Sequence, residues 1–175
     1  MDQKLTSIFS TQGTVSLSIS NQSFSNENIC DEFIDCSFFN KVNFLNCCFE
    51  GCEMIGVEFN FCVFENCTFN DTIIRKSEIT DCKFKHCEFM ESQLSPKTNF
   101  FRTLFMNSEF SDVNLSWAFF HKCQFTKINL TKIKLKALSV VDPITENISF
   151  NDLEFDKTDP IRITITDSFY FPKEI

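Results

Sequence analysis

Between Val42 and Pro96 the sequence divides into consecutive groups of five residues that all follow one rule. The groups read VNFLN, CCFEG, CEMIG, VEFNF, CVFEN, CTFND, TIIRK, SEITD, CKFKH, CEFME and SQLSP. The third position is always large and apolar, from Phe44 to Leu94, and the first position is always small, from Val42 to Ser92. An internal repeat of fixed period decides the architecture of a chain before any other signal does. The fold is therefore derived from this stretch.

A period of five fits neither a helix, whose period is near 3.6, nor a flat strand, whose period is 2. It fits a chain that makes a short extended step, turns a corner and repeats, with the small and the large side chain pointing inward. Four steps close a square, so residues about 20 apart stack and pair as in a parallel sheet, roughly 4.8 Å apart. The sequence therefore predicts an all-β fold, a quadrilateral parallel β-helix of about five to seven coils.

This pattern resembles that of the pentapeptide-repeat proteins, whose family fold is a right-handed quadrilateral β-helix, a solenoid. The Phe centres with Cys partners are most similar to the Qnr-type and microcin-immunity members. The resemblance implies a rod that binds protein and catalyses nothing, because Qnr-type members bind DNA gyrase and topoisomerase IV and counter inhibitors of these enzymes. Qnr-type proteins usually end in a short helix that helps them to dimerise, and no helical period is present at the end of this sequence.

The five-residue rule delimits three segments. Residues 1–21 do not follow it, and the alternation from Thr14 to Ser20 predicts a strand in an N-terminal cap. Residues 22–157 are expected to form the β-helix, with one extra residue, Lys97, after which the rule resumes. Residues 158–175 contain alternating isoleucines and are expected to form a strand-like C-terminal cap.

Two places in the β-helix segment are irregular. In residues 22–41 two registers stay open, and a register slip is expected before Val42. The later phase puts Phe39 inside, whereas a phase one residue earlier puts Phe33 and Phe38 inside. Farther on, Asp142-Pro143 is expected to break the rhythm, because proline restricts the backbone and lacks an N–H group.

The net charge of −8 bears on the kind of partner. An acidic chain does not seek nucleic acid phosphates, which demand Lys and Arg, so no nucleic acid partner is expected. A protein with a basic groove is a more suitable partner. No run of about 18 apolar residues is present, and the first residues lack the pattern of a signal peptide, so no membrane partner is expected.

Most of the 10 cysteines occupy the small inward position. These are Cys47, Cys52, Cys62, Cys67, Cys82, Cys87 and Cys123. There they behave as small hydrophobes, and stacked side chains that point in parallel have poor disulfide geometry. We therefore expect reduced thiols and a cytoplasmic protein. A zinc site is the alternative, but no CxxC pair is present, and no metal or other cofactor is expected.

The sequence contains no recognisable catalytic constellation. His86 and His121 each follow a large apolar centre and are expected to face solvent. No Gly-rich phosphate loop or metal-binding helix motif is present, and a regular rod lacks the concave apolar pocket that enzymes use. We expect no enzymatic activity and no catalytic residue.

Because four groups make a coil, each outward residue is assigned to one of four faces. Two faces are slightly basic, whereas the face centred on Phe49, Phe69 and Phe89 is strongly acidic. Its carboxylates are Asp31, Glu50, Asp71, Glu88, Glu91, Glu109 and Asp112. Only Lys132 opposes them. Either this face is a protein-binding surface for a basic partner, or its charge serves solubility by opposing aggregation.

A further face is centred on Phe39, Phe59 and Phe100 and carries additional aromatic residues. These are Phe38, Phe61, Phe101 and Phe119. Either they form an exposed apolar patch that marks a homodimer interface, or the helix widens locally and covers them.

Two functions of different classes follow. The first is an acidic DNA mimic that occupies the DNA-binding groove of a type II topoisomerase, DNA gyrase or topoisomerase IV, and so protects it from a quinolone or a toxin. The second is a passive scaffold or effector-type interaction module that binds no topoisomerase. Fold alone does not decide between them.

Overall fold

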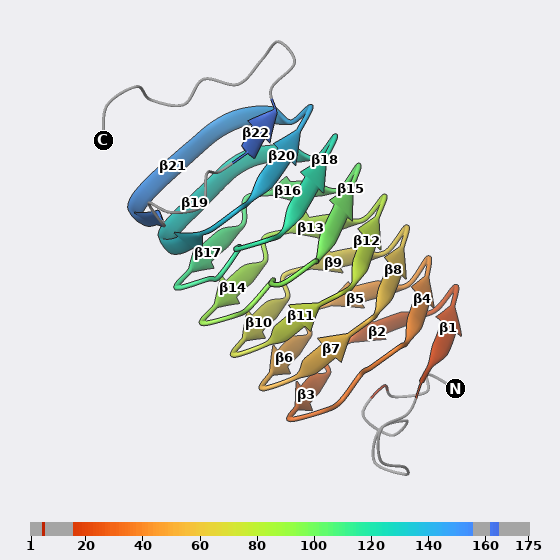
Figure 1. Cartoon of the computed structure of the whole chain (residues 1–175). Coiled ribbons are helices and arrows are strands. Elements are labelled where there is room, and N and C mark those ends of the chain that lie inside the picture. Colours follow the sequence, from red (N-terminus) through yellow and green to blue (C-terminus); the bar gives the residue numbers. More distant parts are fainter. Residues whose placement is uncertain (1–4, 6–15, 156–161, 165–175) are drawn as a thin grey trace.

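The computed structural model describes Leu5 and residues 16–155 and 162–164. These residues form a right-handed, four-sided parallel β-helix of about seven turns (Figure 1). Short strands lie on each side of the square, and strands of successive coils pair in parallel. The predicted fold class is confirmed.

The strands fall into four faces, numbered in chain order within one coil. Face 1 contains β2 (Ser23–Ser25), β5 (Asn43–Leu45), β9 (Val63–Glu65), β13 (Lys83–Lys85) and β16 (Leu104–Met106). Face 2 contains β3 (Asn28–Cys30), β6 (Cys48–Glu50), β10 (Thr68–Asn70), β14 (Glu88–Met90) and β17 (Glu109–Ser111). Face 3 contains β7 (Glu53–Ile55) and β11 (Ile73–Arg75), extended by single bridges at Phe33, Gln93 and Asn114.

Face 4 forms the longest unbroken ladder. It contains β1 (Ser18–Ser20), β4 (Phe38–Asn40), β8 (Glu58–Asn60), β12 (Glu78–Thr80), β15 (Asn99–Phe101), β18 (Phe119–His121), β20 (Ser139–Val141) and β22 (Arg162–Thr164). Two longer strands, β19 (Gln124–Leu135) and β21 (Ile144–Phe155), run around faces 1, 2 and 3 of the last coils. β1 and β22 lie in the segments that were expected to form caps, and both continue the face 4 ladder.

The register of the first coil follows the later of the two phases. Phe24, Ile29, Ile34 and Phe39 are buried, whereas Phe33 is 53% exposed. β1 pairs with β4 at an offset of 20 residues, and β4 pairs with β8 at the same offset, so the expected slip before Val42 is wrong. A one-residue slip turns every side chain of a strand to the other face, so pairing with the next coil fixes the register.

The extra residue near Lys97 lies in the corner between faces 3 and 4. β8 pairs with β12 at an offset of 20 residues, and β12 pairs with β15 at an offset of 21, so Glu78 is opposite Asn99. Lys97 has a φ of 62°, and the other corner residues also have a left-handed φ. The added residue is therefore absorbed in the turn, and the inward positions stay in phase on both sides of it.

Pro143 occupies a small inward position and is buried. The prediction that Asp142-Pro143 breaks the rhythm is wrong, since Ile144 of the next strand pairs with Gln124 at an offset of 20 residues. At this position in other coils the N–H group donates to the small side chain of the coil above, as Thr72 N does to Ser92 Oγ at 3.1 Å. A proline gives up only that one bond, because no strand ladder bond uses this group.

The core consists of columns of stacked phenylalanine rings. On face 1 the Phe64 ring lies 4.7 Å from Phe44 and 4.7 Å from Phe84, centroid to centroid, and nearly parallel to both. Rings of neighbouring columns meet edge to face, as Phe59 and Phe64 do at 5.3 Å. These arrangements are the preferred ones for aromatic pairs.

The small inward residues fill the corners and bind the backbone. The thiol of Cys52 donates to the carbonyl oxygen of Ile29, at 3.3 Å, and lies 3.6 Å from that of Glu50. The hydroxyl of Ser77 makes the equivalent contacts with Met54 and Arg75, at 3.0 Å each. Cys, Ser and Thr thus recur at this position because each is small and can donate to a carbonyl that points into the core.

The described structure places all 10 cysteines as free thiols. Burial raises the pKa of Cys52 to about 11 and that of Cys123 to about 12, because the thiolate is poorly solvated inside the coil. Cys30 and Cys36 are exposed. The buried thiols are shielded from reagents in solution by the coil, and are expected to be inert in the folded protein for that reason.

This difference predicts the outcome of a thiol titration. With Ellman's reagent at about pH 8, the folded protein should release a fast signal from the exposed cysteines only, and 10 equivalents after denaturation without reductant. The buried thiols should react at the rate of unfolding. Equal and fast reaction of all thiols in the folded state would contradict the packing of the small inward position.

The corners share a backbone conformation that was not predicted from the sequence. The residue two positions after each centre has φ near +50°, as in Asn46, Asn66 and Asp71. Glycine, asparagine and aspartate tolerate this left-handed region best. Their frequency at the fifth position of the repeat was the available signal.

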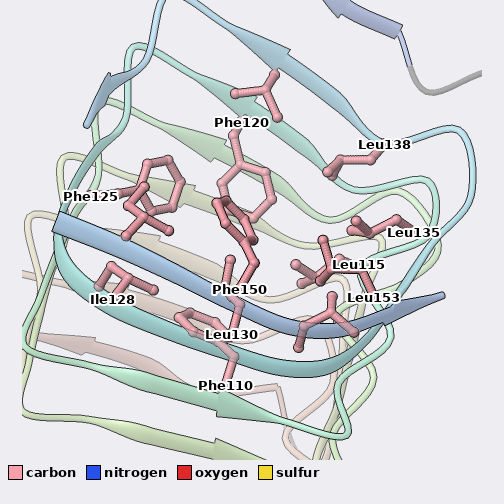
Figure 2. A pocket seen from close by; sticks show the side chains of 13 residues that line it. Phe110, Leu115, Phe120, Phe125, Ile128, Leu130, Leu135, Leu138, Phe150 and Leu153 are labelled. Atoms are coloured by element: carbon pink, nitrogen blue, oxygen red, sulfur yellow. The ribbon is translucent and has the colours of Figure 1, made fainter. Parts of the chain in front are cut away.

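Packing loosens toward the C-terminal end. There a cavity of about 80 Å³ is lined only by apolar side chains, among them Phe110, Leu130 and Phe150 (Figure 2). The cavity arises where the phenylalanine columns are interrupted, by Leu130 on face 2 and by Thr145 above Phe125 on face 1. At the same level the bulky Ile128 is buried in a small inward position.

Candidate protein-binding surfaces

The structure places all seven predicted carboxylates on face 2 or on the corner that follows it, and all seven are exposed. Glu88 and Glu109 lie directly opposite each other on β14 and β17. Asp71, Glu91 and Asp112 occupy the same corner in three successive coils, each with a left-handed φ. Since successive coils are roughly 4.8 Å apart, these groups repel one another and their fields add.

The acidic face has a gap that divides it into two clusters. Gly51 occupies the corner between Asp31 and Asp71, and Asn70 follows Glu50 along the ladder. Asp31 and Glu50 therefore lie apart, on the first two coils. The main cluster, which we name the upper acidic cluster, spans three successive coils and consists of Asp71, Glu88, Glu91, Glu109 and Asp112.

The upper acidic cluster carries little compensating charge. Lys132 lies one coil above Asp112 at the same corner. The ion pairs found between described residues join Arg75 to Glu53 at 3.9 Å and Arg102 to Asp81 at 2.6 Å, and both lie on other faces. The cluster thus presents an uncompensated negative field to solvent.

The predicted apolar residues do not lie in one file. Phe38 lies on β4, three coils below Phe101 on β15, with Glu58 and Glu78 in the column above it. Phe101 and Phe119 are half-buried and pack together, with ring centroids 5.7 Å apart. Phe61 is on the corner between faces 4 and 1 and is 53% exposed. The half-buried pair of Phe101 and Phe119 fits the second alternative, in which the helix covers the additional rings, whereas Phe61 is open to solvent.

The two histidines lie on different parts of the surface. His86 is exposed at a corner, and His121 packs edge-on against the Phe101 ring at 5.9 Å. In the part of the chain that the structure describes, no group of three or more His, Cys, Asp or Glu side chains is placed to hold a metal ion. No helix among these residues is long and apolar enough to cross a membrane.

The outer surface also carries a bidentate ion pair. Arg102 donates from Nε and Nη2 to the two carboxylate oxygens of Asp81, at 2.7 and 2.6 Å. Hydrogen bonding to this guanidinium holds the pKa of Asp81 below its ordinary value. Sequence reasoning missed the pair because the two residues are 21 positions apart, across the added Lys97.

Comparison with known proteins shows the fold. No family model matches the sequence, and no curated protein matches it. Among solved structures, a trypsin-treated variant of QnrB1, a plasmid-mediated fluoroquinolone resistance protein, is 15% identical with a TM-score of 0.55, covering 80% of this chain and 72% of that one. HetL, a pentapeptide repeat protein from the cyanobacterium Nostoc involved in heterocyst differentiation regulation, is 10% identical with a TM-score of 0.26, covering 86% and 92%.

The fold and the sequence rule agree. The coils of four short steps explain why the sequence repeats every five residues, and their parallel ladders explain why its centres recur at every twentieth residue. By this five-residue rule and these four-sided coils, the chain has the pentapeptide-repeat β-helix fold.

Proposed function

We propose that this protein is a non-enzymatic, cytoplasmic rod whose acidic face occupies the basic DNA-binding groove of another protein, with DNA gyrase and topoisomerase IV as the first candidates. The observation that carries the proposal is the upper acidic cluster, in which five exposed carboxylates lie on three successive coils. A surface without a binding role would more naturally mix the two signs of charge, as the other faces do.

The charge density supports a resemblance to DNA. Three coils at roughly 4.8 Å each span about 14 Å, which gives about one negative charge per 3 Å. One strand of B-DNA carries one charge per ~3.4 Å. Cations that line a DNA-binding groove would therefore meet carboxylates at a spacing close to that of phosphates.

The partner class is inferred from two sources. QnrB1, which has the same fold, is a fluoroquinolone resistance protein. The Phe and Cys pattern of the core is similar to that of Qnr-type members, which bind gyrase and topoisomerase IV. Both sources favour these two enzymes as partners, with quinolone or toxin protection as the outcome for the cell.

A direct assay tests the proposal. Purified protein should retain gyrase or topoisomerase IV in a pull-down, and should change supercoiling or relaxation by that enzyme with and without a quinolone. Added linear duplex DNA should compete with the protein for the enzyme. Absence of binding to both enzymes would favour the scaffold function instead.

A further inference from the structure

The corner between faces 4 and 1 carries a regular ridge of side chains. One residue per coil projects from it, in the order Lys41, Phe61, Asp81, Arg102, Lys122 and Asp142. All six have a left-handed φ between 47° and 55°. They are spaced by one coil each, roughly 4.8 Å, so the ridge is about 24 Å long. It lies diagonally opposite the corner that carries the upper acidic cluster.

A groove runs beside the ridge along face 1. Its lining includes ridge residues together with Leu104 and Ile144 of the first column of face 1. Ile144 is 61% exposed and Phe61 is 53% exposed, so the groove combines exposed apolar side chains with charged groups of the ridge and with Lys83 of face 1. Such a combination is typical of a surface that receives another molecule.

Phe61 indicates that the ridge is a binding surface. A bulky residue with φ of 55° is strained, and asparagine would fit this corner better, as it does at Asn21 of the same column. The exposed ring gains little in the isolated chain, since half of it faces solvent. Because every residue of the ridge shares this φ, the exposed ring itself, and not the backbone strain, marks a surface that contacts another molecule.

The order of charges along the ridge is self-complementary. Read from Lys41 upward it is positive, aromatic, negative, positive, positive, negative. A two-fold axis between the levels of Asp81 and Arg102 brings Asp81 opposite Arg102 of the second copy. It also brings Phe61 opposite Lys122, and Lys41 opposite Asp142. Each of these contacts is attractive, and a cation over an aromatic ring is favourable.

We propose that the ridge is the interface of an antiparallel homodimer, in which the two ridges lie against each other level by level. The coil spacing is the same in both copies, so the three pairs of levels stay in register. A two-fold interface requires the same patch on both subunits, and each pair is then formed twice. A parallel arrangement would instead put like charges on like charges.

The central contact is a network of four charged groups. The bidentate pair between Asp81 and Arg102 exists in each chain, and the axis adds the same pair between chains. Networks of this kind hold better than isolated surface pairs. Because the ridge is narrow, the interface is smaller than that of an obligate dimer, so the association should be weak and sensitive to salt.

The dimer leaves the acidic faces free. The two upper acidic clusters lie on the outer sides of the pair, since each is diagonally opposite its own ridge. The inference therefore does not depend on the proposed topoisomerase partner. It concerns the opposite side of the rod, and its tests measure association alone.

Cross-linking gives the first test. A zero-length carbodiimide reagent should join Lys41 to Asp142, identified by mass spectrometry of peptides. Within one chain these residues are five coils apart, about 24 Å, so this link forms only between copies. The link should disappear on dilution and at high salt. If sedimentation shows only monomer up to millimolar concentration, or shows dimer without this link, the proposal is overturned.

Charge exchange gives the second test. Asp81→Arg and Arg102→Asp should each weaken dimerisation at least about tenfold, because each places like charges at the axis. The double exchange should restore it. Lys127→Asp makes the same kind of change at another corner and should leave sedimentation unaltered. Failure of the double exchange to restore the dimer, with both variants folded by circular dichroism, would contradict the arrangement.

Phe61→Asn separates association from folding. Asparagine accepts the left-handed corner, so the variant should melt at a higher temperature than the natural protein. It removes the ring opposite Lys122, so dimerisation should fall at least about fivefold. A variant that is more stable and still dimerises fully would overturn the role of Phe61.

Discussion

Replacing Phe64 by alanine is expected to destabilise the protein by about 3–5 kcal/mol, the upper end of the range for a single core substitution. The Phe64 ring is 1% exposed and stacks between Phe44 and Phe84 at 4.7 Å from each. Its removal leaves a cavity in a narrow column, and the coils above and below are held apart by their own ladders, so collapse is limited. Chemical denaturation followed by circular dichroism measures the change.

Phe24→Ala is the matched control at the end of the same column. Phe24 is also buried, but among the described residues its ring stacks with that of Phe44 alone, at 5.8 Å. The loss of fewer aromatic contacts should make this substitution less costly than Phe64→Ala by at least about 1 kcal/mol. Equal costs at the two positions would show that stacking along the column adds nothing to burial.

The inward positions could be predicted because the repeat encodes them directly. From Val42 onward each centre and each small residue was assigned by counting in fives, and Phe44, Cys62 and Phe100 are all buried as expected. The extra residue at Lys97 could be located because the five-residue rule resumes one residue later. Pattern alone sufficed here, since every coil repeats the same environment.

Where the five-residue pattern weakens, pairing between coils decides which residues point inward. In residues 22–41 the apolar residues fit two phases, and only the ladder to the next coil selects Phe39 over Phe38 for the interior. Pro143 appeared to interrupt the rhythm because proline is unfavourable in most strands. Its position uses no ladder N–H, a detail of the corner geometry that no residue count contains.

The two surfaces differ in how far the sequence revealed them. The residues of the acidic face follow from counting in fives along the sequence, so all seven carboxylates could be assigned to one side of the rod. The gap at Gly51 and the pair between Asp81 and Arg102 depend on neighbouring coils and on side-chain conformation. The self-complementary order of the ridge becomes visible only when residues 20 or 21 positions apart are read as one column.

Neutralising the acidic face is expected to weaken binding to the proposed topoisomerase roughly 100-fold, since four surface charges at about 0.5–1 kcal/mol each contribute about 2–4 kcal/mol. The variant combines Asp71→Asn, Glu88→Gln, Glu91→Gln and Glu109→Gln. These changes keep the shape of each side chain and remove its charge. Stability should rise slightly, because like charges on successive coils no longer repel.

The salt dependence of binding identifies the mechanism. Affinity measured between low and physiological ionic strength should fall less steeply for the variant than for the natural protein, because fewer charge contacts remain to be screened. A control with the same change in net charge replaces Glu58, Glu65, Glu78 and Glu146 by Gln on faces 4 and 1. It should bind almost as the natural protein does.

The comparison of the two variants separates steering by a defined surface from a general effect of net charge. If both lose affinity equally, the whole negative field attracts the partner and the upper acidic cluster has no special role. If neither loses affinity, the carboxylates of face 2 serve solubility, since a charged face opposes aggregation of β-structure. Only loss confined to the variant of face 2 places the basic groove of the partner against Asp71, Glu88, Glu91 and Glu109.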